Sequence, residues 1–125
     1  MYQPDARIDS VLFDSYGKND LRKKCFFALI GDGSYCFKGN YTGKVGDPTL
    51  FTGIATDELY LTRAESYARQ GDSAKALNDL NRLMSKRINE TEFIPYALPT
   101  QKGLLRVILT ERRKELLFRA LRWTD

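Results

Sequence analysis

The sequence predicts a mainly α fold: a helical hairpin and a long carboxy-terminal helix, preceded by a small β-hairpin in the amino-terminal third. Three observations support this prediction. Apolar residues recur at helical spacing over residues 55–84 and again over 104–123. A glycine divides the first of these stretches, as expected for a turn between two helices. Aromatic residues alternate with polar neighbours over 35–41, which is the spacing of a β-strand.

The composition is that of a globular chain. Of its 125 residues 42% are hydrophobic and 29% are charged, and the length suffices for a modest core. We expect a single partial domain over 1–125, with a short helix, β-hairpin and loop over 1–52 and a helical scaffold over 53–125. The net charge is only +4 and basic residues alternate with acidic ones, so nucleic acid is not an expected partner. No run approaches the ~20 apolar residues of a membrane span.

The first element expected along the chain is a short helix over residues 9–16, with the sequence DSVLFDSY. Asp9 or Ser10 is suited to cap its amino end, because short polar side chains accept hydrogen bonds from the first free backbone N–H groups. Residues 17–20 contain glycine, asparagine and aspartate, and they end the helix.

A β-hairpin is expected from about Lys23 to Tyr41, folded about a glycine-containing turn. In this register Ala28 pairs with Cys36, and Cys25 pairs with Gly39. The two cysteines are then not cross-strand partners and face opposite sides of the sheet. We expect two buried or half-buried thiols, and a disulfide would require a different register or turn.

The helical hairpin follows a loop over residues 42–51 that contains two glycines and a proline. Its first helix is expected from about Ala55 to Gln70, Gly71 is suited to end it, and Asp72 or Ser73 is suited to cap the second helix. The apolar stripes comprise Leu59, Tyr60, Ala64, Tyr67 and Ala68 in the first helix and Ala76, Leu77, Leu80, Leu83 and Met84 in the second.

The spacing of these residues matches the tetratricopeptide pattern, in which small residues allow two helix backbones to approach and larger ones fill the space beside them. The matching positions are Tyr60, Ala64, Tyr67, Gly71, Ala76, Leu80 and Leu83. Only one copy is present, whereas repeat arrays need at least ~3 copies. The hairpin is therefore interpreted as a scaffold, with a protein–protein interaction module using its groove as the alternative.

The last helix is expected from Thr100 or Gln101 to about Trp123, after a connection over residues 88–99 with two prolines. Leu105, Ile108, Leu109, Arg112, Leu116, Arg119 and Trp123 share one face, and Leu104, Glu111, Glu115 and Phe118 share the adjoining one. This apolar arc is wider than a surface helix requires.

Three charged residues, Arg112, Glu115 and Arg119, lie within or beside that arc, where an unpaired charge would be costly. The expected partners are Arg63 and Glu65 on the first helix of the hairpin. We therefore predict a structural ion-pair network that joins the two helices, in preference to a catalytic acid–base pair.

No motif predicts catalysis. The sequence has no histidine, no glycine-rich phosphate loop, no spacing typical of metal ligands and no activated nucleophile, so no catalytic residue, cofactor or metal is expected. An enzyme that uses the carboxylates of Glu65, Glu111 and Glu115 is a rival hypothesis. The aromatic residues Tyr35, Phe37 and Tyr41 are candidate ligand-binding residues, because aromatic rings stack on planar faces such as a sugar ring.

Two long segments resemble a known family. The runs FTGIATDELYLTRAESYARQGDSAKALNDLNRLMSKR from Phe51 and LLRVILTERRKELLFRALRWTD from Leu104 resemble the carboxy-terminal region of the SusD/RagB family of outer-membrane glycan-binding lipoproteins. The preceding NDLRKKCFF and FKGNYTG resemble the β-structured segment of the same family. The most specific part is the ERRKEL-x-F-x-x-x-RW-x-D pattern that ends at Asp125.

The resemblance implies a mostly helical scaffold with tetratricopeptide-like helix pairs. It also implies a protein of the cell surface that acts with a SusC-like TonB-dependent transporter, binds oligosaccharide or polysaccharide and does not hydrolyse it. The chain is shorter than a typical member and begins without a lipoprotein signal, so we expect it to be a fragment of the family fold. Surfaces that missing neighbours would cover are then expected to cause self-association.

Overall fold

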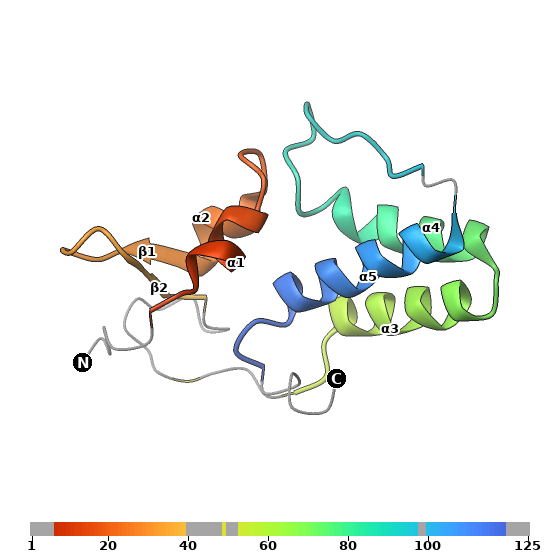
Figure 1. Ribbon diagram of the computed structural model, residues 1–125, viewed down its shortest axis with the longest axis horizontal. Helices are drawn as coiled ribbons and strands as arrows, with labels where there is room; N and C mark the ends of the chain where they lie inside the picture. Colours follow the sequence, from red (N-terminus) through yellow and green to blue (C-terminus); the bar gives the residue numbers. More distant parts are fainter. Residues whose placement is uncertain (1–6, 40–48, 50–52, 98–99, 120–125) are drawn as a thin grey trace. The chain divides into compact units, whose positions relative to one another are not determined.

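A computed structural model describes residues 7–39, 49, 53–97 and 100–119 of the chain (Figure 1). The chain divides into two compact units, Met1–Phe51 and Thr52–Asp125. The first contains α1 (Ser10–Ser15), α2 (Leu21–Phe26), β1 (Phe27–Leu29) and β2 (Tyr35–Phe37), and the second contains α3 (Thr56–Arg69), α4 (Ser73–Met84) and α5 (Gln101–Glu115). Helices predominate among the described residues, which confirms the predicted mainly α fold with a small β-hairpin.

The two short helices of the first unit each begin at an aspartate. Asp9 caps α1 as predicted, since its Oδ1 accepts a hydrogen bond from Val11 N at 3.0 Å. Asp20 caps α2 in the same way through Arg22 N at 3.0 Å, and its Oδ2 lies 2.7 Å from Arg22 Nη2 in a buried ion pair. The prediction of a strand from Lys23 onward is wrong, because this cap and ion pair start a helix that continues to Phe26.

The β-hairpin is shorter than predicted but has the predicted register. Strands β1 and β2 are antiparallel, with the pairs Phe27↔Phe37, Ala28↔Cys36 and Leu29↔Tyr35. The predicted pairing of Cys25 with Gly39 is wrong, because Cys25 belongs to α2. Both thiols are free, and Cys36 is buried as expected, whereas Cys25 is exposed. Tyr41, the predicted end of the hairpin, lies outside the described residues.

The second unit is a helical hairpin with a third helix packed against both of its members (Figure 1). Helix α3 has the predicted bounds to within one residue, and α4 begins directly after Asp72, one of its two predicted caps. Gly71 has φ +88°, a left-handed conformation that glycine adopts without a Cβ clash, and it separates the two helices. Ala64 and Ala76 are fully buried, as the close approach of two helix backbones requires.

The core of the second unit lies among its three helices. It comprises Leu61, Ala64, Ala68, Ala76, Leu80, Leu83, Met84, Leu104 and Ile108. The prediction that Leu59 belongs to the buried stripe is wrong, since Leu59 is 58% exposed while Leu61 is 0% exposed. Residues two apart lie about 200° apart around a helix, so only one of these leucines is able to face the core.

The amino end of α4 is held by a charged cap. Asp72 Oδ1 accepts a hydrogen bond from Lys75 N at 3.1 Å, and its Oδ2 lies 2.7 Å from Lys75 Nζ. The hydrogen bond and charge of the Lys75 side chain hold the pKa of Asp72 below its ordinary value of 3.8. The deprotonated carboxylate therefore stabilises the folded state above pH 3.8, and this contribution is lost as the pH falls through the folded-state pKa.

An Asp72→Asn variant tests this pH dependence, because asparagine keeps the cap but removes the charge. At neutral pH we expect the variant to melt at a lower temperature than the wild type in thermal unfolding followed by circular dichroism. The difference should shrink as the pH is lowered below 3.8 and also at high salt, which screens exposed charges. A difference that persists unchanged in acid would contradict a role for the carboxylate charge.

Helix α5 begins at its predicted cap and ends earlier than predicted. Thr100 Oγ1 accepts a hydrogen bond from Gly103 N at 3.1 Å, which fixes the amino end. The helix stops at Glu115, and Phe118 has φ +59°, a left-handed conformation that does not continue a right-handed helix. The prediction of a helix to Trp123 is therefore wrong at Phe118, and Trp123 itself lies outside the described residues.

The buried face of α5 also differs from the broad arc expected. Leu104, Ile108, Glu111 and Glu115 are buried, whereas Leu109 is 41% exposed. The side of α5 that is buried is therefore the one that carries Leu104, Glu111 and Glu115, together with Ile108. Among the described residues, no helix has the length and hydropathy needed to cross a membrane.

Candidate functional site

Tyr35, the first candidate for ligand stacking, is positioned by a neighbouring aromatic ring. Its ring stacks on Phe13 of α1 with centroids 3.9 Å apart and an interplanar angle of 19°. The ammonium of Lys23 lies 4.1 Å from the Phe13 centroid, a favourable cation–π distance. Contact with Phe13 therefore orients the ring of a residue that is only half-buried.

Phe37, the second candidate, lies two residues further along β2 and therefore on the same side of the strand. Its ring is tilted against Phe26 with centroids 5.7 Å apart. Gly39 packs closely on both rings, since a Cβ at this position would lie 2.8 Å from Phe26 Cδ1 and 2.9 Å from Phe37 Cζ. Phe37 is therefore held in place and half-buried. The third candidate, Tyr41, lies outside the described residues.

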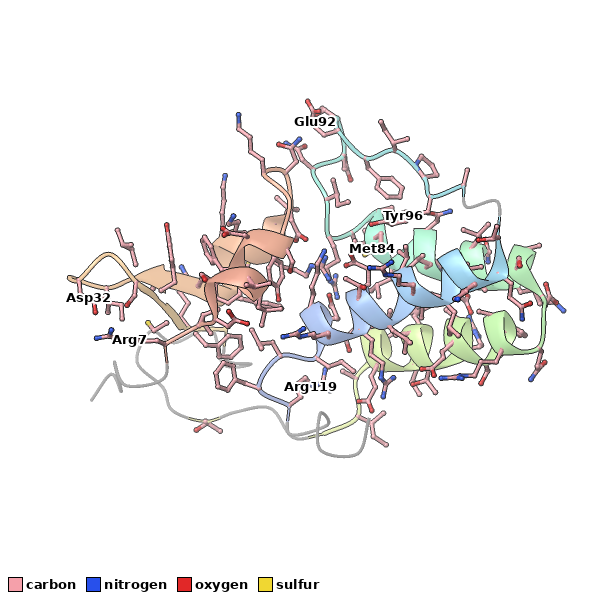
Figure 2. The ribbon with its side chains drawn as sticks, in the orientation of Figure 1. Arg7, Asp32, Met84, Glu92, Tyr96 and Arg119 are labelled. Atoms are coloured by element: carbon pink, nitrogen blue, oxygen red, sulfur yellow. The ribbon has the colours of Figure 1, made fainter. Side chains whose placement is uncertain are left out.

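The turn between the strands is fixed by Asp32 (Figure 2). Its Oδ1 accepts hydrogen bonds from Ser34 N at 2.9 Å and Ser34 Oγ at 2.6 Å, and its Oδ2 lies 2.7 Å from Arg7 Nη2. The hydroxyl of Ser34 is the main cause that holds the pKa of Asp32 below its ordinary value. These contacts order the turn beside the candidate aromatic residues.

Arg119 joins the segment after α5 to the start of α3 (Figure 2). Its Nη1 lies 3.2 Å from Asp57 Oδ1, and its Nη2 lies 3.4 Å from Glu58 Oε2. The same Nη2 donates a hydrogen bond to the carbonyl of Gly53 at 2.8 Å. Sequence reasoning missed both acidic partners, although their place in the first turn of α3 was a usable signal, because acidic residues favour that position.

Glu115 forms the buried part of the same network. Its Oε1 lies 2.6 Å from Arg87 Nη2 and accepts a hydrogen bond from Arg87 Nε at 2.7 Å. Arg87 also lies 3.9 Å from Asp57, so it connects the segment after α4 to α3. Arg112 donates a hydrogen bond from Nη1 to Thr62 Oγ1 at 3.0 Å. Ion pairs and hydrogen bonds thus join all three helices at this end of the unit.

The structure gives Arg63 and Glu65 partners other than the α5 residues expected from the sequence. Arg63 forms a bidentate ion pair with the buried Asp79 of α4, with Nε–Oδ2 and Nη2–Oδ1 distances of 2.7 Å each. This hydrogen-bonded carboxylate raises the pKa of Arg63. Glu65 pairs with Arg69 one turn along α3 at 2.7 Å. Asp79 was missed, although its place within the apolar stripe of α4 was a signal of a buried charge.

The two tyrosines of α3 that match the tetratricopeptide pattern make cation–π contacts with side chains of the same helical hairpin. Tyr60 and Tyr67 are half-buried and pack against the core. The guanidinium groups of Arg63 and Arg82 lie 5.5 and 5.6 Å from the Tyr60 centroid, and Lys75 Nζ lies 5.3 Å from the Tyr67 centroid. Both rings thus make contacts within the hairpin itself.

The carboxylates considered for acid–base chemistry are held in ion pairs. The pairs are Glu65 with Arg69, Glu111 with Lys114 and Glu115 with Arg87. Within the described ranges, His, Cys, Asp and Glu residues form no group able to hold a metal ion. Neighbouring lysine and arginine side chains thus neutralise the charges of these carboxylates, as expected of a structural scaffold.

Three packed helices with a tetratricopeptide-like hairpin define the second unit as an α-helical scaffold. Residues 56–125, more than half of the chain, match the family model described as SusD family. The chain therefore belongs to the SusD family, which confirms the resemblance noted in the sequence. Among curated proteins, none matches this sequence.

Proposed function

We propose that this chain acts in non-catalytic carbohydrate binding and nutrient uptake, as part of a SusD-like surface protein. The observation that carries the proposal is the match of residues 56–125 to the SusD family. The matched segment starts at the first residue of α3 and includes α4 and α5, so the family pattern covers the helical scaffold. In this proposal the scaffold supports loops and strands that recognise the glycan.

Tyr35 and Phe37 are the proposed stacking residues. A sugar ring presents an apolar C–H face, which packs favourably on an aromatic ring. The stack on Phe13 fixes the orientation of Tyr35 before ligand binds, and the contact with Phe26 does the same for Phe37. Such preorganisation reduces the side-chain entropy lost on binding.

We further propose that the protein does not hydrolyse the glycan that it binds. A glycosidase needs two carboxyl groups that face each other across a cleft. Glu111 and Glu115 instead lie on the buried side of α5 and bind Lys114 and Arg87. Their ion pairs support a structural role for these carboxylates.

The proposed cellular setting follows from the family. We place the protein at the outer-membrane surface as a lipoprotein, where it would deliver oligosaccharide or polysaccharide to a SusC-like TonB-dependent transporter. Co-purification of such a transporter with the tagged protein from native membranes would support this partnership. Recovery of the tagged protein alone under conditions that preserve other outer-membrane complexes would contradict it.

Isothermal titration of the chain with a panel of neutral oligosaccharides tests glycan binding. We expect saturable binding of at least one member, without release of reducing sugar. Tyr35→Ala should weaken that binding by about tenfold or more, because truncation of an aromatic contact residue commonly costs at least ~1–2 kcal/mol. Tyr35→Phe should bind like the wild type, since it keeps the ring.

The circular dichroism spectrum of each variant serves as the folding control for this titration. Equal binding by Tyr35→Ala and wild type would remove Tyr35 from the site while leaving glycan binding intact. Release of reducing sugar by the purified chain would contradict the non-catalytic part of the proposal.

A further inference from the structure

The solvent-facing side of α5 carries three basic residues in a narrow line. Lys102, Arg106 and Arg113 are all exposed. Their spacings of four and seven residues place them within about 40° of one another around the helix, along roughly 16 Å of its axis. We call these three residues the α5 basic stripe.

The positive charge of the α5 basic stripe is not neutralised by the parts of the chain that the structure describes. None of its three side chains lies within ion-pair distance of a described carboxylate, unlike Arg63, Arg87 and Arg119. The acidic residues of α5 itself point the other way, since Glu111 and Glu115 are buried. The outer side of α5 is therefore a linear array of three cations.

The apolar content of this surface argues against a protein partner. Leu109, which is 41% exposed, is a single large apolar residue among the cations. Stable protein interfaces have an apolar or aromatic centre that is depleted in lysine. A linear polyanion instead gains binding free energy as cations displace its condensed counterions, and this gain needs no apolar centre.

We propose that the α5 basic stripe binds a polysaccharide that carries repeated anionic groups, so that the glycan ligand of this protein is acidic. This inference rests on the glycan-binding function proposed above and adds the charge of the ligand. The spacing of the cations along the helix axis matches a ligand with repeated charges better than one with a single charge. Binding is then electrostatic and weakens as salt concentration rises.

Affinity measurements with alginate, a polyuronate, and with neutral pullulan test the proposal on the full chain. The test variant combines Lys102→Gln, Arg106→Gln and Arg113→Gln. The matched control combines Lys18→Gln, Lys24→Gln and Lys86→Gln, which removes the same charge from exposed positions outside the stripe. The stripe variant should lose roughly 3- to 100-fold in alginate affinity, as the loss of three exposed charge contacts implies. The control variant should bind nearly as well as the wild type.

Salt dependence supplies a second readout. The slope of log affinity against log salt concentration should be shallower for the stripe variant than for the control variant. Equal losses in the two variants would overturn the inference. Equally tight binding of a single-stranded DNA oligonucleotide or of phosphatidylglycerol vesicles would also overturn it, because the stripe would then not select a glycan.

The outcomes separate this inference from the function on which it rests. Saturable binding of a neutral oligosaccharide without binding of alginate would overturn the acidic-ligand inference and leave the proposed function standing. Failure to bind any glycan, neutral or acidic, would overturn both.

Discussion

Replacement of Leu61 by alanine is expected to destabilise the protein by about 2–5 kcal/mol, because it leaves a cavity among three helices. Leu61 is 0% exposed and belongs to the core cluster of α3, α4 and α5. The neighbouring helices are held by buried residues and ion pairs, so they have little freedom to collapse into the space. Urea unfolding followed by far-ultraviolet circular dichroism measures the change.

Leu59→Ala is the matched control for this measurement. The same chemical change two residues away removes a side chain that is 58% exposed, and the expected effect is within about 0.5 kcal/mol. Comparable losses in the two variants would mean that the buried face of α3 is not the one described.

This pair of leucines shows how far sequence periodicity determines a fold. The turn between α3 and α4 could be predicted because it depends on local chemistry: Gly71 adopts a left-handed conformation and Asp72 caps the next helix. Which leucine is buried depends on where the other helices pack, and that information is not local. Periodicity alone therefore included Leu59 and omitted Leu61.

The helix α2 was missed for a different reason. Residues 21–30 combine cations with aromatic and apolar residues, and aromatic residues favour strands. The decisive feature is Asp20, which caps the helix and binds the buried side chain of Arg22. A buried arginine is rare enough that composition gives no reason to expect one.

At the candidate site too, contacts between residues far apart in the sequence could not be predicted. The sequence could indicate that charges on α5 need partners, since a buried charge is costly, but it could not identify those partners. Arg87 follows α4 and Asp57 begins α3, far from α5 along the chain, yet packing brings both into the network. Likewise, alternation along β2 indicated the candidate residue Tyr35, whereas its stack on Phe13 depends on tertiary structure.

The second large effect is expected at Arg87, whose replacement by methionine should cost about 3–5 kcal/mol of stability. Methionine keeps most of the aliphatic stem of the side chain, so the loss reports mainly on the charge. The carboxylate of Glu115 is only 2% exposed, and without Arg87 it loses a partner at 2.6 Å while staying out of water. Urea unfolding of the single variant measures this cost.

The double variant Arg87→Met with Glu115→Leu distinguishes the charge effect from simple loss of packing. It removes the buried carboxylate together with its partner, and replacement of a buried ion pair by apolar residues is often nearly neutral. We therefore expect the double variant to be more stable than Arg87→Met alone, although it carries more substitutions. As an exposed reference, Arg69→Met breaks the Glu65 pair and should cost at most about 1 kcal/mol. If the double variant is less stable than the single one, then Arg87 and Glu115 stabilise the unit through packing, and the ion pair is not what joins α5 to the end of α4.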